Sequence, residues 1–264
     1  MKDIFLAIWT YRHFIKSSIK SDLRSRFVRS KLGALWMILQ PLAQGGIYAI
    51  VLSRVLAAKL PGLNNVYAYP VYLMSGMVAW SLFNELILRS LTMFVDNGGV
   101  MKKIMFPRIC IPIVTAGSAL VNNLLLLVAS LLIFLCMGFG PKLALLWLPL
   151  LMLVNLSLGM ALGMILGIFN VFVRDVAQVV GVVLQLLFWL TPVVYMVTVT
   201  PNSLRSLIKL NPVYPIVSGY QKVMLYGQAP DIGELVVVGA VSLLLLGLSM
   251  MLFRRAAADM VDVL

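Results

Sequence analysis

The chain has 264 residues, of which 62% are hydrophobic and only 11% are charged, and its mean hydropathy is +1.02. This composition is too apolar for a soluble domain, so we expect most of the chain to be surrounded by lipid. The net charge of +12 does not indicate a nucleic-acid partner, because the basic residues lie mostly before and between apolar stretches, as in membrane proteins.

Residues 1–31 combine apolar and basic side chains. Ile4, Ile8, Tyr11 and Ile15 recur at helical spacing. This pattern predicts an amphipathic helix lying in the cytoplasmic membrane interface, with Lys and Arg toward anionic headgroups. The alternative is a solvated helix packed on a soluble partner. The segment is too charged for a cleavable signal peptide, so we expect the first span to direct insertion.

Six stretches without Asp, Glu, Lys or Arg reach the roughly 20 residues needed to cross about 30 Å of hydrocarbon. They are Leu32–Ser53, Leu60–Asn84, Ile109–Pro141, Leu143–Val173, Val176–Leu204 and Leu235–Phe253. The predicted fold class is therefore an all-α membrane protein with six transmembrane helices within residues 32–253. A further stretch, Leu210–Gln221, is too short to cross.

The basic residues predict the orientation of these spans. If the N-terminus is cytoplasmic, fifteen of the 21 Lys and Arg residues lie on the inner side of the membrane. Because Lys and Arg are retained in the cytoplasm, this asymmetry predicts that both termini are cytoplasmic, including a tail over residues 254–264.

The loop over residues 93–108 follows the second span. Glu85 and Arg89 end that span, and their spacing of four residues permits an ion pair at the membrane boundary. The turn residues 96–99 precede a basic and apolar stretch that predicts a short cytoplasmic helix, which Pro107 limits.

Polar and small residues occur inside two later spans. Asn122 and Asn123 lie near mid-depth, where unpaired amides are costly, so they should face other helices or an aqueous path. Gly159, Gly163 and Gly167 repeat every four residues and predict close helix packing, within one chain or between subunits.

The fifth span opens with Arg174 and Asp175, and Pro192 should kink or end its helix near the outer face. Residues 196–234 are mostly uncharged and rich in Pro. They predict two short re-entrant helices in the outer leaflet, shielded from lipid by protein. A folded external cap is the alternative.

Catalytic and metal-binding motifs are missing from the sequence. It contains no phosphate-binding glycine loop, no His and Cys cluster and no paired carboxylates, so we predict no catalytic residue, no metal site and no cofactor in this chain. A self-sufficient channel or secondary carrier would need ionisable groups at mid-membrane, and a membrane-bound glycosyl or lipid-modifying enzyme would need acidic or His residues clustered at one face. We identify neither, so a partner should supply the energy for transport.

The stretch from Ser21 to Leu42 contains R-S-R-F-V-R-S-K-L-G-A-L-W-M-I-L-Q-P. It resembles the entry to the first span of ABC-2 type polysaccharide export permeases, whose pattern is R-x-R-[FY]-x-x-S-x-L-G-x-x-W-x-x-L-x-P. Three later stretches also resemble this family: K-K-I-M-F-P-R at Lys102–Arg108, R-D followed by F-W-L-T-P-V-V-Y at Arg174–Tyr195, and N-P at Asn211–Pro212.

The resemblance implies a half-transporter that forms a homodimer and binds two copies of a separate ATPase subunit, which holds the ATP and Mg. It implies export of a lipid-linked polysaccharide across a bacterial inner membrane. The nearest branch is O-antigen export in lipopolysaccharide biosynthesis, and capsule and teichoic acid exporters are the alternatives.

The resemblance also implies that the loop at residues 93–108, together with the N-terminal interface helix, receives the ATPase. The candidate coupling residues are Asp96, Val100, Met101, Lys102, Lys103, Ile104, Phe106 and Arg108. The apolar side chains would dock into a cleft of the ATPase, and the lysines would contact its acidic rim. We expect ATP binding to close the ATPase subunits and this loop to transmit the movement, so that the spans of two protomers part into a polymer channel.

Two further groups of residues fit a lipid-linked polysaccharide. Arg24, Arg26, Arg29 and Lys31 are candidates to bind the lipid pyrophosphate, although retention on the cytoplasmic side explains them nearly as well. Aromatic rings can stack on sugar faces in a channel, and the candidates are Tyr48, Trp80, Phe83, Phe188, Trp189 and Tyr195. The alternative role of these rings is anchoring at the membrane interface.

Overall fold

The computed structural model describes residues 9–25, 35–36, 39, 42–43, 46–47, 65, 67–103, 108–197 and 200–264. Within these ranges the regular elements are all helices, which confirms the predicted all-α class. The first predicted span lies almost entirely outside the described residues.

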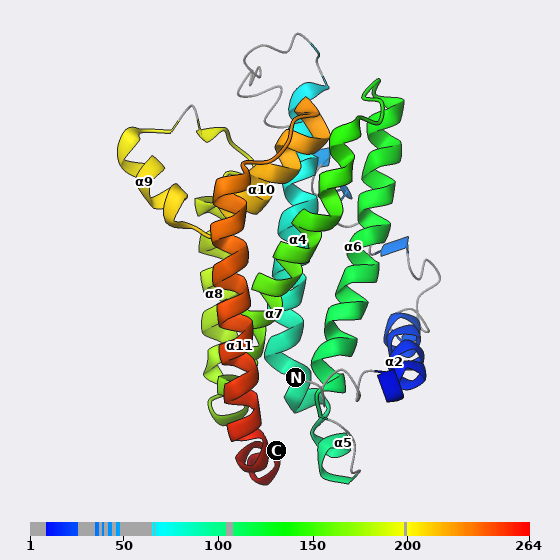
Figure 1. Cartoon of the computed structure of the whole chain (residues 1–264), viewed down its shortest axis with the longest axis vertical. Coiled ribbons are helices and arrows are strands. Elements are labelled where there is room, and N and C mark those ends of the chain that lie inside the picture. Colours follow the sequence, from blue (N-terminus) through cyan, green and yellow to red (C-terminus); the bar gives the residue numbers. More distant parts are fainter. Residues whose placement is uncertain are drawn as a thin grey trace.

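Among the described residues, four helices are long and apolar enough to cross a membrane. They are α4 (Ala68–Asp96), α6 (Cys110–Cys136), α7 (Leu148–Phe172) with the preceding turn η1 (Leu143–Trp147), and α11 (Ile232–Val263). They run side by side along the long axis of the molecule (Figure 1). The prediction that Leu143–Val173 forms one span agrees with η1 and α7 to within one residue.

Helix α8 (Asp175–Leu190) runs along the same axis and has 16 residues. It ends directly before Thr191 and Pro192, so the prediction that Pro192 ends this helix is confirmed. The predicted extent of the fifth span, to Leu204, is wrong because the chain turns after Leu190 and a separate helix follows. At 1.5 Å per residue α8 is about 24 Å long, somewhat less than a full hydrocarbon thickness.

Three short elements cover one end of the bundle: α9 (Asn202–Leu210), α10 (Tyr214–Gln221) and η3 (Lys222–Tyr226) (Figure 1). Helix α10 is packed against α4 and α7, and its Ile216, Val217 and Tyr220 side chains are buried. The prediction of short helices in the outer segment is therefore confirmed, whereas their entry into the bilayer stays a prediction.

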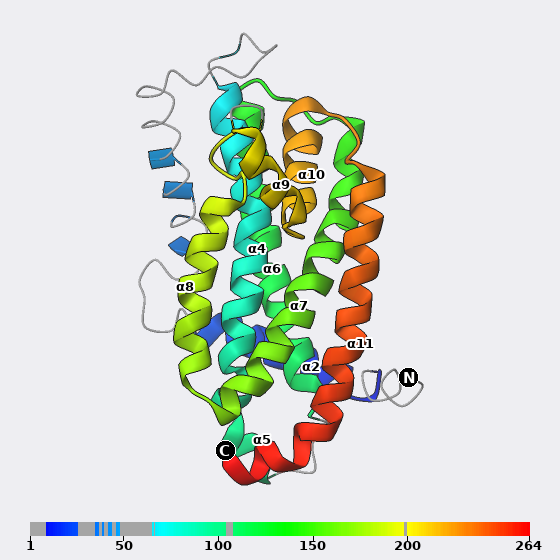
Figure 2. The ribbon, with the colours of Figure 1, turned by 90° about the vertical axis from the view of Figure 1, so that its left-hand side faces the viewer.

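At the opposite end lie α2 (Arg12–Ser25), α5 (Gly98–Lys103) and the last turns of α11. Helix α2 is seen end-on in Figure 1 and lengthwise in Figure 2, so it crosses the bundle axis. Its Ile15 is buried, and its Ile19 lies against Gly117 of α6. A helix in this orientation has the geometry expected of an interface helix.

Two helices extend beyond the predicted spans because charged residues lie inside them. The predicted second span, Leu60–Asn84, stops before Glu85, whereas α4 continues to Asp96. The predicted tail over residues 254–264 is helical as well, since α11 continues past Arg254 and Arg255 to Val263. In both cases the helix tolerates charge because the charged groups are paired or exposed.

The glycines of α7 allow it to approach α4 closely. A Cβ atom at Gly163 would lie 2.6 Å from Cβ of Ser90, and one at Gly159 would lie 2.8 Å from Leu86. At Gly167 an added Cβ would meet the backbone carbonyl of Ser90. The predicted packing motif is thus confirmed, and the packing is within one chain.

Asparagine side chains add hydrogen bonds between helices. Asn123 of α6 donates to the Val78 carbonyl at 2.9 Å, and Asn155 and Asn170 of α7 donate to the carbonyls of Ala79 and Leu91, each at 2.8 Å. All three acceptors lie on α4. Unpaired amides are costly in lipid, so these bonds favour the packing of α6 and α7 against α4. Helix α4 is in this sense the central helix of the fold.

Candidate functional site

A pocket of about 540 Å³ lies at the end of the bundle where α2 meets the end of α4 and the start of α6. Its walls combine hydroxyl, charged and apolar side chains. They are Phe14, Ser18, Ser21, Asp22, Arg89, Thr92, Met93, Asp96, Asn97, Cys110, Ile111, Val114 and Thr115. The pocket therefore joins the predicted interface helix to the start of the predicted coupling loop.

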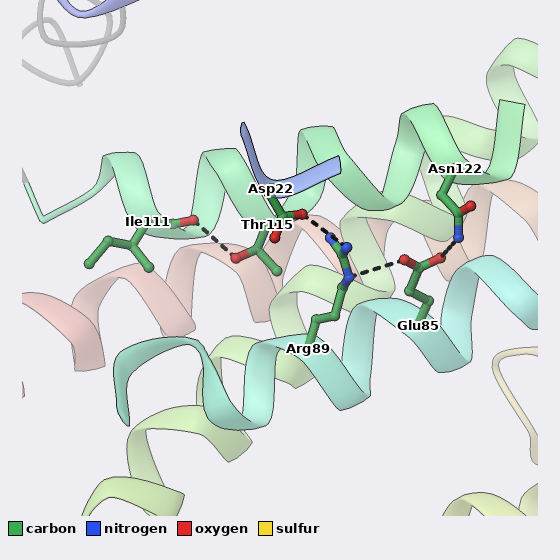
Figure 3. A network of polar contacts seen from close by, with 6 residues as sticks. All are labelled: Asp22, Glu85, Arg89, Ile111, Thr115 and Asn122. Atoms are coloured by element: carbon green, nitrogen blue, oxygen red, sulfur yellow. Dashed lines mark hydrogen bonds and ion pairs between the residues drawn. The ribbon is translucent and has the colours of Figure 1, made fainter. Parts of the chain in front are cut away.

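Arg89 is the centre of a polar network on one wall of this pocket (Figure 3). Its guanidinium donates to Asp22 of α2 at 3.0 Å and forms an ion pair with Glu85, also at 3.0 Å. Asn122 of α6 donates to the other oxygen of Glu85 at 2.6 Å. One connected set of side chains thus links α2, α4 and α6.

The predicted ion pair between Glu85 and Arg89 is confirmed, whereas its position at the membrane boundary stays a prediction. Glu85 lies eleven residues before the end of α4, about 16 Å along the helix, and contacts Asn122 near the middle of α6. The Arg89 side chain is only 13% exposed. The opposite charges offset one another, which makes this partial burial tolerable.

The sequence analysis missed Asp22, which connects the network to α2. Asp22 lies on a helix with Lys16, Lys20 and Arg24, and it is the single carboxylate of α2. A lone acidic residue in a basic helix was the available signal. Its partner, 67 positions away, could not be inferred from local spacing.

Helix α5 provides the short helix predicted in the coupling loop, although it begins at Gly98, earlier than expected. Asp96 and Lys102 are exposed, whereas Met101 is buried. Met101 therefore packs inward and Lys102 is available to a partner. The Arg108 guanidinium donates to the carbonyl of Ala257 on α11. Val100 and Lys103 lie on α5, and Ile104 and Phe106 lie outside the described residues.

The predicted pyrophosphate cluster is described only at Arg24, which is exposed near the end of α2. Arg26, Arg29 and Lys31 lie outside the described residues. Lys16 and Lys20 precede Arg24 at intervals of four and are also exposed, so these three form a row along α2. Phe14, Ser18 and Ser21 face the pocket from another side of the helix.

The aromatic residues predicted to line the channel differ in how deeply their side chains are buried. Trp80 and Phe83 are 8% and 2% exposed, and Trp80 makes an edge contact with Phe188 at 5.4 Å. Trp189 is 61% exposed, and Tyr195 is half-buried. Tyr48 lies outside the described residues. Burial favours a packing role for Trp80 and Phe83 and leaves Trp189 as an aromatic ring on the surface.

Most of α8 is exposed in the single chain. Of its side chains only Val180 and Leu184 are buried. Gln178 and Gln185, seven residues apart, share the exposed part of the helix with Trp189. Two amides on an otherwise apolar surface are unfavourable against lipid, so this face is suited to a polar path or to a second subunit.

The turn that follows the end of α8 is stabilised by side-chain hydrogen bonds. Asn211 donates to the Thr191 hydroxyl at 2.8 Å, Gln221 of α10 donates to the Pro192 carbonyl at 3.1 Å, and Tyr69 of α4 donates to the Val194 carbonyl at 2.6 Å. The carbonyls of Trp189 and Leu190, which the helix end leaves unpaired, accept from the Tyr195 hydroxyl at 3.0 and 3.3 Å. The T-P and N-P motifs, 20 residues apart in sequence, thus meet in space.

The family model for the ABC-2 type transporter matches residues 13–225. This chain belongs to the ABC-2 type transporter family. The match begins in α2, includes the pocket, α5 and α8, and ends in η3, so it covers the elements that carry the candidate residues.

Several relatives match most of the chain. The O-antigen export system permease protein RfbA of Myxococcus xanthus is 28% identical over 257 residues, which cover 97% of this chain and 96% of the relative. RfbA of Klebsiella pneumoniae is 27% identical over 210 residues, or 78% of each chain. The polysialic acid transport protein KpsM of Escherichia coli is 22% identical over 243 residues, 88% of this chain and 89% of the relative. The relatives are thus named as permease or transport proteins for polysaccharide.

Proposed function

We propose that this ABC-2 chain is the permease subunit of an ATP-driven exporter that moves a lipid-linked, O-antigen-like polysaccharide across a bacterial inner membrane. The observation that carries the proposal is the match to the Myxococcus xanthus O-antigen export permease over 97% of this chain. The match covers nearly the full length of both chains, rather than a single shared segment.

In this proposal the chain crosses the membrane six times, with both termini cytoplasmic. The four long helices and α8 account for five of these crossings, and the segment before α4 supplies the first. The end that carries α2, α5 and the last turns of α11 is the cytoplasmic one. Helices α9 and α10 then lie at the outer face and enter the outer leaflet.

Two copies of the chain form a homodimer, and the polymer passes beside α8. Support comes from the exposed face of that helix, where Gln178 and Gln185 can contact sugar hydroxyls and Trp189 can stack on sugar faces. Trp80 packs against Phe188 of this helix, and Phe83 packs against Trp80, so the two buried rings stabilise the position of α8.

Energy comes from two copies of a separate ATPase subunit that bind ATP and Mg. They dock on the cytoplasmic end around α5, where Asp96 and Lys102 are exposed. Arg24, with Arg26, Arg29 and Lys31, attracts the pyrophosphate of the lipid carrier to the membrane interface.

Reconstitution tests the proposal directly. The chain is purified with its ATPase subunit, inserted into vesicles, and supplied with lipid-linked O-antigen polymer. We expect ATP-dependent appearance of polymer on the far side, and no transport when the ATPase subunit is omitted. Transport without the ATPase would contradict the proposal and favour a self-sufficient channel.

Capsular polysaccharide is the second candidate substrate, because the chain also matches the polysialic acid transport protein of Escherichia coli over most of its length. The same vesicles distinguish the two. Faster transport of a lipid-linked capsular polymer than of an O-antigen polymer would assign the chain to capsule export.

A further inference from the structure

The final residues of the chain, Arg254–Leu264, are an ordered part of the bundle. We refer to them as the α11 end segment. Helix α11 is unbroken from Ile232 to Val263, and Figure 2 shows its last turns crossing the lower end of the bundle beside α5. The segment therefore lies next to the helix that we propose as the contact for the ATPase.

Buried side chains join the α11 end segment to the surrounding helices. Met260 is fully buried, in the same hydrophobic cluster as Met101 of α5 and Ile111 of α6. Directly before the segment, the ring of Phe253 stacks on Phe94 of α4 with centroids 5.2 Å apart. The segment thus shares one small core with α4, α5 and α6.

The α11 end segment also contacts both ends of the coupling loop. At the first end, the Leu264 side chain lies 3.3 Å from the position that a Cβ atom of Gly98 would occupy. At the second end, Arg108 donates to the Ala257 carbonyl. Both contacts are made by one helix, so the start of α5 and Arg108 are fixed to the same helix.

Helix α5 needs these contacts in order to be stable. Helix α5 has six residues, and a helix of that length is not stable without tertiary contacts. If it were unsupported, a push from a partner would bend or unfold it instead of moving the spans.

We propose that the α11 end segment is a positioning element for energy coupling. It holds α5 and Arg108 in fixed positions relative to α11, so that movement of the ATPase against α5 is transmitted to α11 and, through the ring pair of Phe253 and Phe94, to α4. This inference rests on the proposed function, because it requires an ATPase that pushes on α5.

The test uses the complete reconstituted complex and measures polymer exported per ATP hydrolysed. Met260→Asp places a carboxylate in the small core, and we expect this ratio to fall about fivefold or more, as for a coupling free energy above roughly 1 kcal/mol. Met260→Leu keeps an apolar side chain and should restore the ratio. Val263→Asp, at an exposed position of the same segment, is the matched control and should stay within about twofold of the wild type.

The ratio separates positioning from a purely structural role. If Met260→Asp only reduces the amount of folded complex, export and ATP hydrolysis fall together, their ratio is unchanged, and the proposal is overturned. If the wild-type complex exports no polymer, the proposed function itself fails, which is a different result.

A crosslink provides an independent test. Cysteines replace Gly98 and Leu264 in a background with Cys110→Ala and Cys136→Ala, and the short distance between these positions permits a disulfide. If α5 and the α11 end segment move together, the oxidised protein keeps its export activity. Loss of export on oxidation, with recovery under a reducing agent, would overturn the proposal.

Discussion

Arg89 of α4 donates to Asp22 of α2 across 3.0 Å, while its other side faces Glu85. A cation between two carboxylates therefore links α2 to α4, and Asn122 of α6 joins the same network through Glu85.

Arg89→Ala should destabilise the protein strongly. It leaves Glu85 partly buried without its cation, and breaking such a pair costs about 3–5 kcal/mol. Asp22→Asn should cost only about 1 kcal/mol, because the Asp22 side chain is 37% exposed. Thermal unfolding of the purified protein in one detergent gives the order of these effects. Lys102→Ala, at an exposed position, serves as the control. An Arg89→Ala protein that unfolds at the same temperature as this control would contradict the role of the network.

Gly167→Ala should also destabilise the protein, because the new methyl group would meet the Ser90 carbonyl of α4. Overpacking of this kind costs about 1–3 kcal/mol. Gly181→Ala on α8 is the matched control, since no atom lies within 4 Å of its added Cβ, and it should cause no loss. Equal unfolding temperatures for the two variants would show that α4 and α7 can separate without cost.

The two tryptophans that we predicted from sequence should behave differently. Trp80→Ala removes a buried ring and should reduce the amount of folded protein, with a cost of about 3–5 kcal/mol. Trp189→Ala removes an exposed ring, so the folded amount should be unchanged while export falls. Quantification of membrane-inserted protein beside the vesicle export assay measures both effects. Normal export by Trp189→Ala would exclude this ring from the polymer path.

Asn211 and Thr191 should be energetically coupled through their 2.8 Å hydrogen bond. Asn211→Ala and Thr191→Val should each lower stability by about 1 kcal/mol, and the double variant should lose less than the sum. A double-mutant cycle on thermal unfolding measures the coupling. Additive effects would mean that the bond does not stabilise the turn after α8.

The basic row of α2 should make transport sensitive to lipid charge. Each Lys or Arg near an anionic surface contributes about 1 kcal/mol, so export by the wild type should rise with the fraction of anionic lipid in the vesicles. Replacement of Lys16, Lys20 and Arg24 by Gln should weaken this dependence. Lys209→Gln with Lys222→Gln, at the other end of the bundle, is the control. An unchanged lipid dependence in the α2 variant would contradict the interfacial position of this helix.

The sequence predicted α7 well because Lys142 and Arg174 flank an uncharged stretch of the right length. It did not show that α4 continues past Glu85, because Glu85 is neutralised by Arg89 and hydrogen-bonded by Asn122, and contacts over 37 and 67 positions are not visible in a local window. At the end of α11 a signal was present, since Phe253, Met260 and Leu264 recur at helical spacing and mark a buried face.

The candidate site was only partly predictable for a similar reason. Composition identifies the aromatic and basic residues, but burial decides which are available to a ligand. Trp80 and Trp189 are the same residue type, and only the packing of α4 against α8 separates a core ring from a surface ring. Asp22, which closes the network, has no motif of its own.

The three asparagine bonds to α4 and the glycine contacts of α7 have a consequence for engineering. These helix surfaces fit through hydrogen bonds and close contacts to single backbone carbonyls of α4. Such a fit is difficult to re-create when the helices come from different proteins. Hybrid exporters with a new polymer preference should therefore inherit α4, α6 and α7 from one parent, while α8, with two buried side chains, is the helix to exchange. Recombination between exporters would be expected to follow the same division.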